Sequence, residues 1–118
     1  MANLVSNLFR GDPRLEKCLL EDSAHVLLGN KGKFVSMIQY AVLLLERSVS
    51  INAREIEQEL YGPDTAKAVL AYKTRRKIIN FSYQTTPDNI VGKMTIRSLD
   101  TEMLAFETRE RLVLPRRT

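Results

Sequence analysis

The clearest signal for the start of a helix in this chain is the stretch Tyr61-Gly62-Pro63-Asp64-Thr65-Ala66-Lys67-Ala68-Val69-Leu70-Ala71-Tyr72. Gly62 permits a sharp backbone turn, and Pro63 suits the first helical position, where a missing N–H costs nothing. Asp64 lies favourably at the positive end of the helix dipole. Apolar residues then recur about one turn apart, so the pattern predicts a helix over residues 63–77 with one face in a core.

A second stretch repeats this construction, and it reads Val91-Gly92-Lys93-Met94-Thr95-Ile96-Arg97-Ser98-Leu99. Aligned on the glycines, both copies have an apolar residue before the glycine and a threonine three positions after it. The repeat predicts a second helix over residues 92–105, which buries Ile96, Leu99 and either Met103 or Leu104. It also predicts that the two helix starts lie side by side.

Three further helices are expected from capping residues and apolar periodicity. Asp12 and Pro13 begin a short helix over residues 13–20, and residues 34–47 have the most regular apolar pattern. Ser50 or Asn52 could cap a helix over residues 53–60, with Ile56 and Leu60 facing inward. Residues 4–9 form either another short helix or an arm that docks on the body.

The segments between and after these helices have less regular patterns. Apolar and polar residues alternate over residues 78–84, which favours a short extended segment. Residues 85–89 predict a turn, in which Asp88 can bond nearby backbone and Asn89 tolerates positive φ. For residues 105–118 we expect a tail that is either a docked strand or a partner-binding arm. The sequence therefore predicts an all-α fold, a compact three-helix bundle with additional short N-terminal helices and a C-terminal tail.

Composition points to one domain. The 118 residues are 44% hydrophobic, enough for a single core but too few for two domains. We divide residues 1–118 into an N-terminal extension (1–29), a central module (30–104) and the tail (105–118). The first residues do not resemble a secretory signal peptide, and the longest apolar run is too short to cross a bilayer.

The net charge of +4 is unevenly placed, because residues 61–118 hold 11 bases and 6 acids. Such a basic half can meet anionic polymers, although solvated helix faces explain a modest excess more often.

No set of residues predicts catalysis or a cofactor. Cys18 and His25 are each the only residue of their type, which excludes a disulfide within the chain and a site of two histidines for zinc. We expect Cys18 to be a buried, inert thiol. The segment 29–33 contains two glycines and two lysines but lacks the spacing of a phosphate-binding loop, so it predicts a turn. The sequence thus predicts a protein that is not an enzyme and has no metal site.

Three stretches taken together resemble the peptidoglycan-binding-like domain, a small three-helix module of bacterial cell-wall hydrolases with two related helix starts. They are residues 35–42, residues 61–73 and residues 88–95, so the resemblance covers roughly residues 30–104. The chain departs from the family pattern at three points. Gln58-Glu59 replaces the usual Asp-Gly, Asn89 stands where glycine is usual, and Lys93 replaces proline in the second copy.

The resemblance implies a non-catalytic module that binds peptidoglycan. Its groove is expected near the faces of the helices over residues 34–47 and 62–77 and the loop over residues 80–92. The residues it suggests for ligand binding are Tyr72, Arg76, Tyr83, Gln84 and Asp88. The N-terminal motifs Leu15-Glu16-x-Cys18 and Asp22-x-Ala24-His25 also look like those of proteins associated with type VI secretion effectors. This likeness implies synthesis in the bacterial cytoplasm and delivery to the periplasm by a contractile secretion system.

Two other functions remain open from the sequence. The same scaffold could serve as an interaction adaptor or chaperone for an effector, with residues 53–60 and 105–118 as contact surfaces. Alternatively, the basic run that ends at Lys77 could bind nucleic acid, but few aromatic residues are interleaved with those bases. Basic residues also suit the negative end of a helix, which is the simpler explanation.

Overall fold

The computed structural model describes residues 3–79 and 86–113, with side chains as far as residue 109. These residues form five α-helices and a single turn of 3-10 helix, and they contain no strand, so the all-α prediction is confirmed. The elements are α1 (Pro13–Leu20), η1 (Asp22–Ala24), α2 (Lys33–Leu45), α3 (Ala53–Gln58), α4 (Pro63–Arg76) and α5 (Lys93–Val113).

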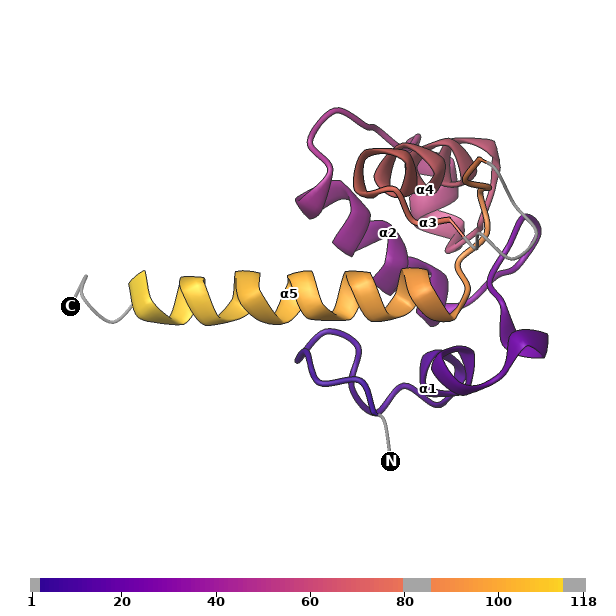
Figure 1. Cartoon of the computed structure of the whole chain (residues 1–118). Coiled ribbons are helices and arrows are strands. Elements are labelled where there is room, and N and C mark those ends of the chain that lie inside the picture. Colours follow the sequence, from indigo (N-terminus) through magenta and orange to yellow (C-terminus); the bar gives the residue numbers. More distant parts are fainter. Residues whose placement is uncertain (1–2, 80–85, 114–118) are drawn as a thin grey trace.

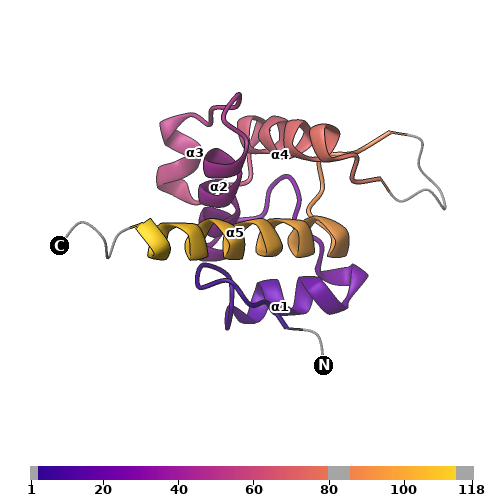
Figure 2. The same cartoon turned by 60° about the vertical axis from the view of Figure 1, so that its left-hand side comes forward.

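Helix α5 lies between two layers of the structure (Figures 1 and 2). The arm over residues 3–12 and helix α1 cover one side, while α2, α3 and α4 lie on the other. Helices α1 and α2 both pack on α5, and α4 packs on α2. The predicted second helix therefore forms the centre of the fold, and it buries Ile96, Leu99 and Met103 rather than Leu104.

The helix starts follow the expected capping chemistry. The Asp12 carboxylate caps α1 by accepting a hydrogen bond from the Leu15 amide at 3.0 Å, with Pro13 in the first turn. Asn52, and not Ser50, caps α3 by accepting from the Glu55 amide at 2.9 Å. The inward face of α3 was wrongly predicted, because Ile56 is 37% exposed whereas Glu55 is buried.

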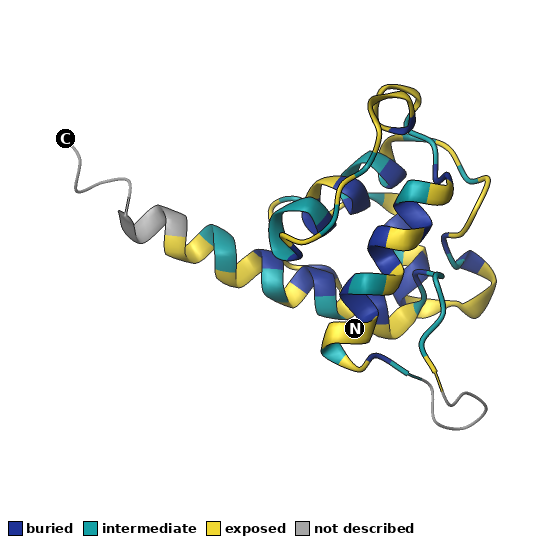
Figure 3. Cartoon of the chain, turned by 90° about the horizontal axis from the view of Figure 1, so that it is seen from above, coloured by how far each residue is buried: buried dark blue, intermediate teal, exposed yellow. Residues whose placement is uncertain are grey.

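Helix α5 is longer than the sequence pattern predicted. It continues to Val113 instead of ending near residue 105, so the docked strand is wrong for residues 105–113, whereas the alternative of a partner-binding arm stays a prediction. Residues 93–113 contain neither glycine nor proline, and nothing stops the helix before Pro115. Residues 114–118 lie outside the described residues. The last turns of α5 extend beyond the other helices, and Figure 3 shows that the buried positions gather in its first half.

The N-terminal arm docks on α5 through carboxylates, as one of the two sequence alternatives expected. Asp100 accepts hydrogen bonds from the amides of Val5 and Ser6 at 2.9 and 2.8 Å. Glu107, two turns further along, accepts from the amides of residues 7 and 8. Phe9 is completely buried beneath this loop. The arm is therefore part of the packed structure.

Two non-glycine residues adopt left-handed backbone angles, both directly after a helix. Glu59 follows α3 with φ of 53°, and Lys77 follows α4 with φ of 57°. Asn89, whose tolerance of positive φ suited it to the turn, does not adopt positive φ. Within the described part of the chain, only Glu59 and Lys77 do so among non-glycine residues. Glu59 therefore has a side chain in a backbone conformation that favours glycine.

Replacing Lys77 by glycine should stabilise the protein. Lys77 is exposed, and a Cβ atom in the left-handed region costs about 1 kcal/mol that glycine avoids. We expect Lys77→Gly to raise the free energy of unfolding by about 0.5–1 kcal/mol in urea titrations. Lys77→Ala keeps the Cβ atom and is the matched control, for which no gain is expected. A glycine variant no more stable than the alanine variant would contradict this explanation.

Candidate functional site

The two repeated helix starts are attached to the same segment of chain, residues 26–31. Val26 forms an antiparallel bridge with Val91, and Lys31 forms one with Leu60. The Tyr61 amide also donates to the carbonyl of Asn30 at 2.9 Å. The Tyr61 hydroxyl reaches the other copy, where it donates to the carbonyl of Asn89. The prediction that the two helix starts lie side by side is confirmed.

The start of α4 is closed from inside the protein by the carboxylate of Glu55. Its oxygens accept from the amides of Asp64 and Thr65, both at 2.9 Å, and from the Thr65 hydroxyl at 2.7 Å. Gly62 gives this carboxylate its room, since a Cβ atom there would lie 2.6 Å from Cδ of Glu55. A buried negative charge is thereby placed at the positive end of a helix.

Burial and hydrogen bonding have opposite effects on the pKa of Glu55. Burial of the side chain acts to raise the pKa, whereas hydrogen bonds from the Asp64 and Thr65 amides, the Thr65 hydroxyl and Asn52 act to lower it. The hydrogen bonds prevail, and the pKa of Glu55 lies below its usual value. The folded protein therefore holds Glu55 as a carboxylate at neutral pH.

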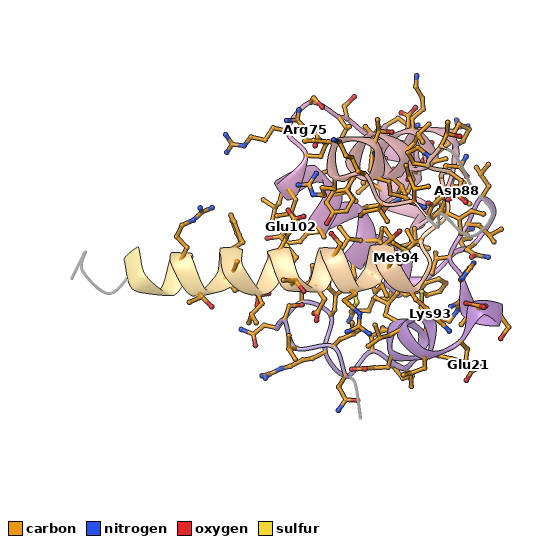
Figure 4. The ribbon with its side chains drawn as sticks, in the orientation of Figure 1. Glu21, Arg75, Asp88, Lys93, Met94 and Glu102 are labelled. Carbon is orange, nitrogen blue, oxygen red and sulfur yellow. The ribbon has the colours of Figure 1, made fainter. Side chains whose placement is uncertain are left out.

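The start of α5 has an open cavity of about 150 Å³ in place of such a carboxylate. Gly92, Met94 and Thr95 from the helix start line it, as do Lys73 from α4 and Asp88 from the preceding loop. Figure 4 shows Asp88, Lys93 and Met94 at this end of α5. The cavity combines polar groups with apolar walls, which is the usual composition of a small-ligand site.

Ion pairs join the charged groups around this cavity. The ammonium of Lys73, which is 6% exposed, lies 2.5 Å from the Asp88 carboxylate and donates to the carbonyl of Ile90 at 2.8 Å. Asp88 also accepts from the Ile90 amide, so the expected bonding to nearby backbone is confirmed. At the rim, Lys93 and His25 lie 3.4 and 3.7 Å from the Asp22 carboxylate.

Two of the sequence-predicted site residues lie elsewhere, in an ion-pair network halfway along α5. Tyr72 is completely buried, and its hydroxyl bonds Ser98 at 2.8 Å and Glu102 at 2.9 Å. The Arg76 guanidinium covers the Tyr72 ring and pairs with Glu102 and Glu46. Figure 4 shows Glu102 well separated from Asp88. A buried ring offers no stacking surface, so the contacts of Tyr72 join α4 to α5.

The carboxylates of this network have lowered pKa values. For Glu46, the hydrogen bond from Ser48 is the main cause, followed by burial, which acts in the opposite sense, and by Arg76 and Arg75. For Glu102, burial acts to raise the pKa, but bonds from Arg76 and Tyr72 prevail and lower it. Arg76 thus links the end of α2 to the middle of α5 through two carboxylates.

Two residues predicted for ligand binding cannot be placed, and two residues that line the cavity were not predicted. Tyr83 and Gln84 lie outside the described residues. Lys73 and Thr95, which line the cavity beside Asp88, were not expected there. Lys73 was assigned to the basic run at the end of a helix. Thr95 could have been found, because it is the repeat partner of Thr65 and both are buried.

The structure also bears on metal binding, membranes and the cysteine. Burial raises the pKa of the Cys18 thiol to about 11, against a smaller opposite effect of Arg14, and the thiol donates to the carbonyl of Val91. Among the described residues, no three His, Cys, Asp or Glu side chains are grouped so that they could hold a metal ion. In that same part of the chain, no helix combines the length and apolarity needed to span a membrane.

Comparisons of the chain with protein-family models, with curated proteins and with solved structures find no match.

Removing the charge of Glu55 should destabilise the protein and make it less sensitive to acid. We expect Glu55→Gln to lower the free energy of unfolding at pH 7 by about 2–3 kcal/mol, because buried donors lose a charged acceptor. A lowered pKa in the folded state means that the contribution of Glu55 is present above its unfolded pKa of about 4.5 and is lost as the pH falls through the folded value. The difference between wild type and variant should therefore shrink in urea titrations between pH 7 and pH 3.

Glu57→Gln is the matched control, since Glu57 is exposed on the same helix. It should change stability little at either pH. A difference between wild type and Glu55→Gln that is the same at both pH values would contradict the assignment of Glu55 as a charged helix cap.

Proposed function

We propose that this chain is a non-catalytic module that binds peptidoglycan and positions a secreted bacterial effector on the cell wall. The observation that carries the proposal is the pairing of both repeated helix starts with residues 26–31. The peptidoglycan-binding-like domain that the sequence resembles is built on two such helix starts held together. The same resemblance supports delivery to the periplasm by a contractile secretion system.

The cavity at the start of α5 supports a binding role. Two ammonium groups, two carboxylates and an imidazole line it next to the apolar side chains of Ile78 and Met94. Such a mixture suits a polar polymer of sugars and short peptides. The chain's single cysteine also supports a role without catalysis, because a thiol with a pKa of about 11 is protonated at neutral pH and is a poor nucleophile.

Retention on purified sacculi tests wall binding. The full chain should pellet with the sacculi more than a control protein of the same net charge does. We expect Lys93→Ala, at the rim of the cavity, to reduce retention about fivefold through loss of one charged contact. Lys67→Ala removes the same charge from an exposed position on α4 that does not line this cavity, and it should retain wild-type binding. Retention no greater than that of the control protein would overturn the proposal, and equal losses in both variants would indicate attraction by charge alone.

The second candidate is an effector adaptor, and it is favoured by the projecting end of α5. A groove of about 500 Å³ runs between α2 and α5, and Leu44, Leu45, Ala105 and Phe106 contribute its apolar lining. Beyond it the helix continues to Val113, past the other elements (Figure 1). An amphipathic partner helix could pack in such a groove.

Deleting residues 110–118 tests the adaptor role without disturbing the docked arm. Glu107 holds the amides of residues 7 and 8, and Phe106 packs on the core, so a deletion from residue 105 would damage the fold itself. We expect the shorter deletion to preserve the melting temperature and to abolish co-purification with an effector encoded beside this chain. Unchanged co-purification would remove the end of α5 from the contact surface.

A further inference from the structure

The two helix starts of the repeat differ in what occupies them. At α4, the Glu55 carboxylate receives the amides of Asp64 and Thr65 and the Thr65 hydroxyl. At α5, the glycine and threonine recur as Gly92 and Thr95, but the segment beside them carries His25 rather than a carboxylate in the place of Glu55. The protein therefore contains one helix start whose donors are bonded by its own carboxylate. In the second, the His25 ring lies beside the glycine, and the helix-start donors have no carboxylate partner among the described residues.

Thr95 is the independent sign of a ligand at the second start. It is only 2% exposed and lines the cavity, yet its hydroxyl has no hydrogen-bond partner among the residues that the structure describes. The amides of Met94 and Thr95 likewise donate to no acceptor within those residues. The Thr95 side chain faces the cavity, and the first amides of a helix have no partner within the helix, so these three donors are available to an acceptor from outside the chain.

We propose that the cavity binds the free C-terminal carboxylate of a peptide, which takes at Thr95 the place that Glu55 takes at Thr65. A carboxylate presents two acceptor oxygens to the amides and hydroxyl of one helix turn, as Glu55 does. The cavity of about 150 Å³ has room for such a group, because a water molecule occupies about 30 Å³ in the liquid. Gly92 makes room for the His25 ring, which forms one wall of the cavity, since a Cβ atom there would lie 3.0 Å from Nε2 of His25.

The charges around the cavity favour one carboxylate over a highly charged anion. Lys73 pairs with Asp88 and Lys93 with Asp22, so the positive and negative charges of these four side chains are equal in number. His25 is the other ionisable group in the lining. The two aspartates would repel a phosphate polymer more strongly than a single carboxylate, which the hydrogen-bond donors of the helix start can hold. The inference deepens the proposed function, because peptidoglycan stem peptides end in such carboxylates.

Titration of the isotope-labelled full chain with N-acetyl-D-alanyl-D-alanine, followed by NMR, tests the site. The free acid should shift the amide resonances of Met94 and Thr95 to saturation, and the same peptide with a C-terminal amide should bind at least about tenfold more weakly. Acetate is the third probe. Acetate binding without peptide binding would overturn the peptide as the source of the carboxylate. Equal binding of acid and amide, or no shift at these residues, would overturn the proposal.

Thr95→Val keeps the shape of the side chain and removes its hydroxyl, so affinity for the acid should fall about tenfold. Thr101→Val is the matched control, an exposed threonine on the same helix that does not line the cavity, and it should bind like wild type. The contrast between acid and amide on the wild-type chain decides the question even if the Thr95 variant does not fold. Sacculus retention is measured separately, so acid-specific binding without retention would leave the pocket standing and remove the wall-binding function.

Discussion

The buried carboxylate of Glu55 is the contact on which the arrangement of α3 and α4 depends. Its hydrogen bonds to the start of α4 tie together residues that are nine and ten positions apart, and they satisfy amides that a helix start leaves open. Gly62 and Tyr61 connect this start to Leu60, which forms a bridge with Lys31. At the other end of residues 26–31, Val26 forms a bridge with Val91, just before α5. The ionised side chain of Glu55 thus fixes the position of α3 relative to the start of α4.

The sequence was sufficient to place most helices, because their signals are local. Asp12, Asn52 and Pro63 begin helices where their side chains or ring predict, and the apolar repeat in α2 marks its buried face. The failures concern information from distant residues. Ile56 was expected inside, but Glu55 is drawn inward by the start of α4. The length of α5 was missed because apolar spacing weakens where it leaves the core, although no helix-breaking residue interrupts it.

The site was predicted only in part, for a related reason. Asp88 was chosen for its turn chemistry, and the structure places it in the cavity. The family resemblance suggested Tyr72 and Arg76, but Glu102 on α5 and Glu46 at the end of α2 bind them. The sequence around a residue does not reveal a hydrogen-bond acceptor that lies so far away along the chain. The repeat was the better guide, since Thr65 and Thr95 occupy matching places and differ only in what each hydroxyl meets.

The arm over residues 3–12 bears on how the chain reaches its folded state. The amides of residues 5 to 8 bind carboxylates 94 to 100 positions further along the chain. Contacts of such long range form slowly, because a large loop must close before they contribute. During synthesis, the bonds from the amides of residues 7 and 8 cannot form until Glu107 has left the ribosome. Completion of the fold is therefore a late event that depends on the last helix.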